Sequence, residues 1–111
     1  MKNLKKLALT TTAVIALVFS VSAQKNYLKD AELAYDHHQY FNAIELYKQA
    51  YTKVKKADAK AKILYKTADS YQQINDLKGA ETYYNKAIKA KYPDPIAILN
   101  LADCLKAQQK Y

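Results

Sequence analysis

The fold is decided by one stretch, residues 75–88, which read NDLKGAETYYNKAI. Asn75 and Asp76 are residue types that begin helices, because their side chains accept hydrogen bonds from the first free backbone N–H groups. After them, small, apolar and aromatic residues recur at helical spacing: Leu77, Ala80, Tyr84, Ala87 and Ile88. The stretch therefore predicts a helix that presents small and aromatic side chains in turn to a neighbouring helix.

The same order of small and aromatic residues recurs along the chain. Sliding the sequence along itself until Ala31 meets Ala68 also superimposes Ala43 on Ala80, Tyr47 on Tyr84, Ala50 on Ala87 and Tyr51 on Ile88. A second offset, which brings Ala68 onto Ala102, also superimposes Leu64 on Ile98, Asp69 on Asp103, Tyr71 on Leu105 and Leu77 on Tyr111. Each alanine lets two helices approach closely, and each larger residue fills the space beside it, so the sequence predicts stacked helical repeats.

The composition also favours an all-α fold. One Gly and two Pro in 111 residues leave almost no turn residues for β-hairpins. The expected helices span residues 27–38, 41–55, 58–73, 77–91 and 95–108. Asp94 is expected to cap the last helix, with Pro95 at its first position.

These positions resemble the tetratricopeptide (TPR) repeat. The second unit carries the matching residues Leu64, Thr67, Ala68, Tyr71, Ala80, Tyr84, Ala87 and Pro93. The third carries Ile98, Leu101, Ala102 and Leu105, and the first carries Tyr27, Ala31, Ala43, Tyr47 and Ala50, with Asp30 where Leu is usual. The resemblance implies a right-handed solenoid of about two and a half helix pairs. Its units are repeat 1 at residues 24–57, repeat 2 at 58–93 and the first helix of repeat 3 at 94–111.

The N-terminal segment, residues 1–23, is typical of a secretory signal peptide. Lys2, Lys5 and Lys6 precede an apolar stretch at residues 7–19, and Val21-Ser22-Ala23 supplies the small residues of a cleavage site before Gln24. The alternative is an uncleaved membrane anchor, but the run is short and threonines at 10–12 interrupt it. We therefore expect an exported protein whose mature chain, residues 24–111, has no membrane span.

A narrower resemblance concerns three segments: Ser22-Ala23-Gln24, residues 40–48 (YFNAIELYK) and residues 89–95 (KAKYPDP). They are similar to the N-terminal repeat region of OmpA-family periplasmic proteins of Bacteroidota, some of which are linked to type IX secretion and gliding. In that family a β-propeller-like segment and a peptidoglycan-binding domain follow the repeats. Because Tyr111 falls halfway through a repeat, we expect a fragment of a longer protein, with outer-membrane or peptidoglycan association residing in further domains.

The charged residues disfavour nucleic acid as a partner. All 18 basic residues are Lys, and removal of residues 1–23 leaves 15 of them against 10 acids, a net charge of +5. Base reading and bidentate phosphate binding favour arginine, which the chain lacks. The densest lysine run comprises Lys48, Lys53, Lys55, Lys56, Lys60, Lys62 and Lys66. It is either a solvated helical face or a docking surface for anionic lipid or an acidic partner.

Catalytic and cofactor motifs are absent from the sequence. Gly79 is the only glycine, so there is no phosphate-binding loop, and no metal-ligand spacing occurs. The adjacent His37 and His38 are expected at a solvated turn, and Cys104 is expected to be buried rather than paired between chains. The sequence therefore predicts a protein that is not an enzyme, with no cofactor, metal or small-molecule substrate.

The first helices of TPR units line a concave groove, and equivalent residues recur there. Leu28, Tyr65 and Leu99 form one row, which Tyr35 extends, and Glu32, Asp69 and Asp103 form the next. An apolar strip beside carboxylates suits a peptide with hydrophobic and basic side chains. The alternative is that the three acids only keep the groove hydrated.

Three functions are consistent with these features. The first is a protein–protein interaction scaffold in the bacterial cell envelope, with a protein or peptide partner in the groove. The second is a structural spacer or assembly arm of a longer, peptidoglycan-associated envelope protein. The third is the non-catalytic part of a cell-wall enzyme. The oligomeric state and the identity of the partner do not follow from the sequence.

Overall fold

The computed structural model describes residues 25–109, and these form an all-α fold with no β-strand in that range. The helices are α2 (Tyr27–Asp36), α3 (Tyr40–Lys53), α4 (Ala57–Gln73), α5 (Leu77–Lys89) and α6 (Ile96–Ala107). The predicted all-α class is therefore confirmed, and each expected helix end lies at most two positions from the observed one. The predicted signal peptide, residues 1–23, lies outside the described residues.

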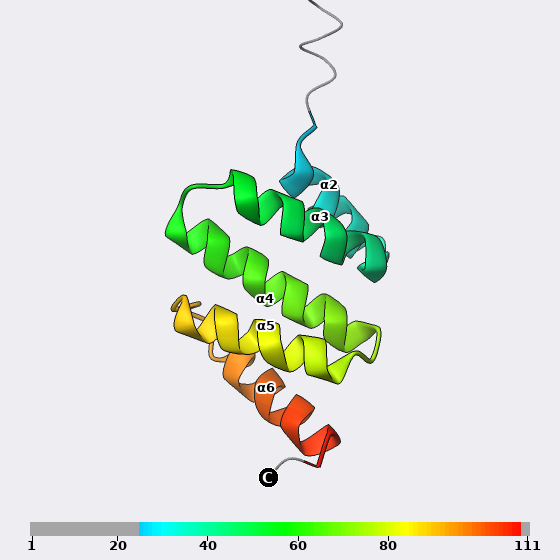
Figure 1. Ribbon diagram of the computed structural model, residues 1–111, viewed down its shortest axis with the longest axis vertical. Coiled ribbons are helices and arrows are strands. Elements are labelled where there is room, and N and C mark those ends of the chain that lie inside the picture. The colour runs from blue at the N-terminus through cyan, green and yellow to red at the C-terminus, as the bar shows by residue number, and fades with distance from the viewer. Residues whose placement is uncertain (1–24, 110–111) are drawn as a thin grey trace, which may run out of the picture.

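Each helix packs mainly against its neighbours in the chain, so the helices follow one another along the long axis of the molecule (Figure 1). Short turns, at residues 37–39 and 74–76, join α2 to α3 and α4 to α5. Such short connections make each pair an antiparallel helical hairpin. The two hairpins stack through α3 and α4, and α6 packs on α5.

The C-terminal ends of α2, α4 and α6 are separated by the same intervals as the repeated residues of the sequence. Each ends with a residue in the left-handed conformation: His38 (φ 59°), Asn75 (φ 63°) and Gln109 (φ 59°). The two intervals between these positions equal the two offsets that align the sequence with itself. In the first two, the next amide N–H closes the turn: Gln39 N donates to Ala34 O at 2.8 Å, and Asp76 N to Tyr71 O at 2.9 Å.

The helix starts use the side chains that the sequence suggests. Asp76 Oδ1 accepts a hydrogen bond from Gly79 N at 2.9 Å, and Asp94 Oδ1 accepts one from Ile96 N at 3.0 Å. Pro95 lies one position before the first helical residue, Ile96, so α6 begins one residue later than expected. Since proline has no N–H, this position loses no hydrogen bond.

The core consists of two clusters with matching residues. Ala31 and Ala43 in the first hairpin, and Ala68 and Ala80 in the second, are all 0% exposed. Tyr47 and Tyr84 lie at most 1% exposed beside these alanines, and Cys104 is buried in the second cluster. Small residues thus allow close helix contact, and tyrosines fill the remaining space in both hairpins.

The third unit departs from this pattern. Ala102 is exposed although its repeat equivalents Ala31 and Ala68 are fully buried. Ile98 and Leu99 are each 59% exposed on the same helix. Within residues 25–109 no helix follows α6, so nothing described covers the face that α3 and α5 cover in the preceding units.

The two buried tyrosines differ in how their hydroxyl groups are satisfied. Tyr84 Oη donates to Gln72 Oε1 at 2.6 Å and accepts from Asn100 Nδ2 at 3.3 Å. Tyr47 Oη is buried with no hydrogen-bond partner in the described part of the chain. Tyr35 occupies the repeat position of Gln72, and its ring meets Tyr47 edge-on with centroids 6.4 Å apart. In the first hairpin the Tyr35 ring therefore occupies the place of the Gln72 amide and offers the buried hydroxyl no acceptor.

We expect Tyr84→Phe to lower the free energy of unfolding by about 1 kcal/mol, because Gln72 and Asn100 lose a buried partner. Tyr47→Phe removes only an unsatisfied hydroxyl, so it is expected to leave stability unchanged or raise it slightly. Urea unfolding followed by circular dichroism measures both variants. An equal loss in the two variants would contradict the assigned hydrogen bonds.

Candidate functional site

The predicted groove residues lie on one side of α2, α4 and α6, here called the first-helix face: Leu28, Glu32, Tyr35, Tyr65, Asp69, Leu99 and Asp103. Leu28 and Glu32 line a pocket of 310 Å³ between α2 and α4. Its opposite wall is α4, which contributes Ile63 and two lysines, Lys62 and Lys66. The structure thus brings an apolar side chain and a carboxylate together, but beside basic residues as well.

Tyr35 and Asp69 are also brought together, in a way that the sequence does not reveal. Tyr35 Oη on α2 donates a hydrogen bond to Asp69 Oδ2 on α4. Asp69 is only 9% exposed, and the Lys66 ammonium lies 4.1 Å from the Tyr35 ring centroid. Asp69 therefore links the two hairpins. The predicted row of three exposed carboxylates is interrupted at this residue, because Asp69 is buried. Glu32 and Asp103 remain exposed.

The other three predicted residues do not join these pairs. Tyr65 stacks on Tyr92, with ring centroids 4.6 Å apart and planes 7° from parallel. Leu99 lines a separate shallow pocket on α6 with Ile98 and Ala102. The first-helix face therefore consists of local sites and is not one continuous apolar strip.

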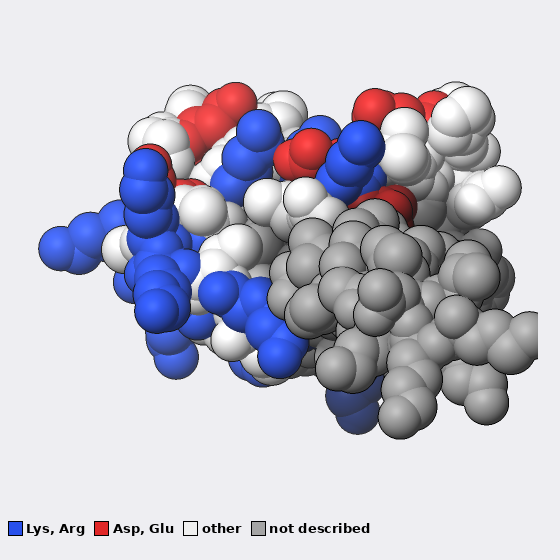
Figure 2. Space-filling view, turned by 90° about the horizontal axis from the view of Figure 1, so that it is seen from above, with Lys and Arg blue, Asp and Glu red and all other residues white. Residues whose placement is uncertain are grey.

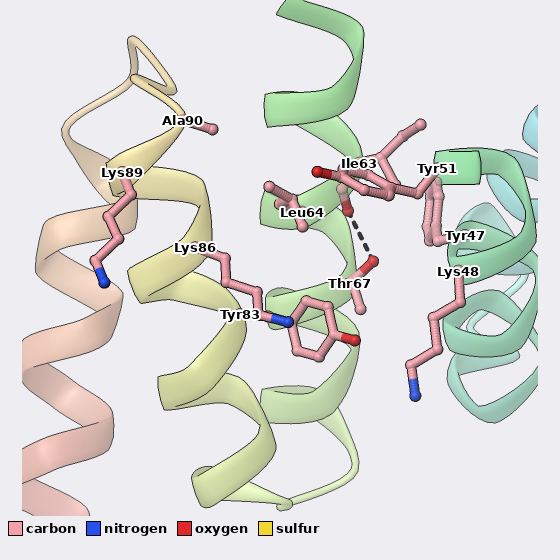
Figure 3. A pocket seen from close by; sticks show the side chains of 10 residues that line it. All are labelled: Tyr47, Lys48, Tyr51, Ile63, Leu64, Thr67, Tyr83, Lys86, Lys89 and Ala90. Carbon is pink, nitrogen blue, oxygen red and sulfur yellow. Dashed lines mark hydrogen bonds between the residues drawn. The ribbon is translucent and has the colours of Figure 1, made fainter. Parts of the chain in front are cut away.

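A second pocket, of 540 Å³, lies between α3, α4 and α5 and was not predicted (Figure 3). We call it the lysine pocket; its lining residues are Tyr47, Lys48, Tyr51, Ile63, Leu64, Thr67, Tyr83, Lys86, Lys89 and Ala90. Thr67 lies two positions, about 200° around α4, from both Tyr65 and Asp69. Tyr65 and Asp69 therefore lie on the opposite side of α4 from the lysine pocket. The recess that holds Leu28 and Glu32 is not opposite, because Ile63 and Tyr47 line both it and the lysine pocket.

Two of the lysine ammonium groups at this pocket make cation–π contacts with a tyrosine ring. The ammonium groups of Lys48 and Lys86 lie 5.9 Å and 4.7 Å from the Tyr83 ring centroid, and Figure 3 shows them on two sides of that ring. Tyr83 stacks on Tyr71 with centroids 5.4 Å apart. A hydrogen bond with Tyr71 raises the pKa of Lys48 above its ordinary value, with burial opposing the shift. The ammonium groups of Lys48 and Lys86 are therefore positioned by contact with the Tyr83 ring.

The charges are distributed unevenly over the face that Figure 2 shows. In the view of Figure 2, Asp and Glu side chains gather toward one edge, whereas lysines cover much of the remaining described surface. The lysine pocket has three lysines and no acidic residue in its lining. The surface near this pocket is thus suited to an anionic group.

Chemistry beyond binding has little support in the described residues. No group of three or more His, Cys, Asp and Glu side chains in residues 25–109 is arranged to hold a metal ion. Burial raises the pKa of the Cys104 thiol, which keeps it in the unreactive protonated form. His38, at the predicted turn, lies with Nδ1 2.7 Å from the Tyr40 hydroxyl on the surface. None of the helices described is long and apolar enough to span a bilayer.

Alkaline pH is expected to destabilise the fold through its buried phenols. Burial is the main cause that raises the pKa of Tyr35, Tyr47 and Tyr84 above the ordinary value of about 10. Above about pH 10 the unfolded chain releases these protons while the folded chain retains them, so the free energy of unfolding falls as pH rises. Below about pH 10 these phenols are protonated in both the folded and the unfolded chain, so their burial causes no loss of stability there.

The measurement is the urea midpoint at several values between about pH 9 and pH 11, with tyrosinate absorbance recorded in parallel. Tyr47→Phe is the control, because it removes one titrating phenol and should flatten the decline. Ionisation of all the tyrosines before any loss of helical signal would contradict the burial.

Comparisons with protein-family models, with curated proteins and with solved structures give no match for this chain.

Proposed function

We propose that this chain is a non-catalytic docking scaffold, built as a TPR-like right-handed solenoid, that binds a protein partner in the envelope of a bacterium. The export signal predicted at residues 1–23 and the resemblance to periplasmic OmpA-family proteins support the location. The partner segment would lie on the first-helix face, with an apolar side chain against Leu28 and a basic one beside Glu32.

One observation carries the proposal: the stacking of two equivalent hairpins leaves a recess between their first helices. Leu28 and Glu32 from α2 meet Ile63, Lys62 and Lys66 from α4 in that recess. Lys56 and Asp58 also line the recess, so charged side chains of both signs surround the apolar Leu28 and Ile63. Such a mixture suits a peptide that carries both apolar and charged side chains. The equivalence of the hairpins, seen in matching helix ends and matching buried alanines, supports the repeat architecture.

The alternative is a structural spacer or assembly arm that contacts only neighbouring domains of a longer envelope protein. The observation that favours it is the exposed apolar face of α6, where Ile98 and Leu99 are each 59% exposed. Such a face is suited to a following helix of the same solenoid. The role of non-catalytic part of a cell-wall enzyme has no specific support among the described residues.

The scaffold proposal is tested by partner capture from envelope extracts with a charge-reversed variant. Glu32→Lys is expected to weaken capture about tenfold, because the basic side chain of the partner then meets a like charge. Asp30→Lys is the matched control: it makes the same charge change on the same helix, about 200° away.

Recovery of the same protein at one-to-one ratio by the wild type and by Asp30→Lys, but not by Glu32→Lys, is the expected result. A spacer would recover nothing at this ratio with any of the three proteins. Equal recovery by all three would place the docking surface elsewhere than the first-helix face.

A further inference from the structure

We propose that the lysine pocket between α3, α4 and α5 is a docking site for an acidic peptide segment, whose aliphatic side chain enters the pocket while its carboxylates pair with the surrounding lysines. The site shares Ile63 and Tyr47 with the recess that holds Leu28 and Glu32, but its charged residues are different. Its three lysines line only this pocket and Glu32 lines only the recess, so charge changes can disable each site without the other.

The base of the pocket is apolar and its polar group is already satisfied. Ile63 and Leu64 of α4 are 3% and 7% exposed at this site. Thr67, also in the base, donates its hydroxyl proton to Ile63 O at 2.7 Å, shown as the dashed line in Figure 3. A ligand group that reaches the base therefore gains apolar contact and does not need to pair with the Thr67 hydroxyl.

The rim of the pocket concentrates positive charge. Lys48 of α3 and Lys86 and Lys89 of α5 line the pocket. In Figure 3 the ammonium groups of Lys48 and Lys86 lie on two sides of the Tyr83 ring, whereas that of Lys89 points away from the ring. The lining contains no acidic residue, and the only carboxylate found to act on Lys48 is Glu45, which does not line the pocket. Like charges around one recess repel one another. The Tyr83 ring lies near two of the three ammonium groups, those of Lys48 and Lys86, and favours their position at the rim. An anionic ligand relieves this repulsion.

The shape of the pocket favours a peptide over other anions. Free phosphate would leave uncovered the half-buried rings of Tyr51 and Tyr83, which line the pocket. Arginine, the usual choice for phosphate, is absent from the chain. A membrane surface would favour lysines spread over a flat face, whereas these three lysines surround a recess of 540 Å³. That volume is large enough for one or two side chains of an extended peptide. The occupant is therefore an aliphatic residue with Asp or Glu on both sides.

The probe is a synthetic peptide with two adjacent leucines flanked on each side by two glutamates, titrated into the full chain. The amide NMR signals of Ile63, Leu64, Thr67 and Tyr83 are expected to shift. Lys86→Glu combined with Lys89→Glu is expected to raise Kd about tenfold or more. The matched control is Lys55→Glu with Lys78→Glu, an identical charge change at exposed positions outside the pocket, which should change Kd less than about threefold.

Three results would overturn the proposal. The first is an equal loss of affinity in the control, which would indicate attraction to net charge alone. The second is unchanged affinity when serines replace the two leucines of the peptide. This result would show that apolar contact in the pocket contributes nothing to binding. The third is binding to vesicles of phosphatidylcholine and phosphatidylglycerol, lost in Lys86→Glu with Lys89→Glu, without binding of the peptide. The variant Glu32→Lys should bind the peptide normally, so failure at this pocket is distinguishable from failure at the first-helix face.

Discussion

Replacement of Ala68 by Leu is expected to lower the free energy of unfolding by about 3 kcal/mol. Ala68 of α4 is 0% exposed and packs in one cluster with Ala80 and Tyr84 of α5. The three added carbon atoms can be accommodated only if the two helices separate, which disrupts the contacts of both neighbours. A domain of this size has a total stability of about 5–10 kcal/mol, so a large part would be lost.

Ala102→Leu is the matched control, because Ala102 occupies the equivalent repeat position on α6 but is exposed. Its expected effect is within about 0.5 kcal/mol, since Leu and Ala both favour helices and nothing described crowds the site. Urea unfolding followed by circular dichroism compares the two. Similar losses in both variants would contradict the observed difference in packing between the second and third units.

Gly79→Ala is expected to destabilise the protein by about 2 kcal/mol, although alanine is the better helix former. A Cβ atom at Gly79 would lie 2.7 Å from Cδ1 of Tyr71 and 3.0 Å from its Cγ. The Tyr71 ring cannot move away freely, because it stacks on Tyr83 and lies under the Lys48 ammonium, 5.4 Å from the ring centroid. Glycine is thus needed at position 79 because the Tyr71 ring packs directly against it, and not because of an unusual backbone angle.

The repeat itself suggests the control for this prediction. In the first hairpin the equivalent positions are Ala34 and Asn42, so a small residue replaces Tyr71 and a larger one replaces Gly79. In a Tyr71→Ala background, Gly79→Ala should therefore become neutral or stabilising by up to about 1 kcal/mol. Persistence of the full loss in that background would rule out the ring contact as its cause.

The helical framework could be predicted from the sequence because its signals are local. Cap residues such as Asp76 and Asp94, and alanines spaced for close helix contact, act within a few residues of one another. The two offsets that align the repeats also relate the equivalent helix ends at His38, Asn75 and Gln109. The exposure of Ala102 could not be inferred from its alignment with Ala68, since burial depends on which helix packs above the residue.

The candidate sites could be predicted only in part, because they depend on contacts between distant segments. The position of Leu28 and Glu32 on one helix face follows from periodicity, and they do line one pocket. The hydrogen bond from Tyr35 to Asp69 joins two different hairpins, and no local pattern distinguishes a buried acid from an exposed one. The lysine pocket likewise combines three helices. Of its lysines, only Lys48 belongs to the lysine run that the sequence offered as a possible docking surface, because Lys86 and Lys89 lie on a different helix.

The central claim, that this chain docks a protein partner, is tested most directly by photocrosslinking in living cells. A photoreactive amino acid is introduced in turn at Glu32, at Lys86 and, as a control on another surface, at Asp30. We expect a discrete crosslinked protein from Glu32 or Lys86 and none from Asp30. Absence of any crosslink from Glu32 and Lys86 in the folded, exported protein, or the same product from all three positions, would contradict the claim.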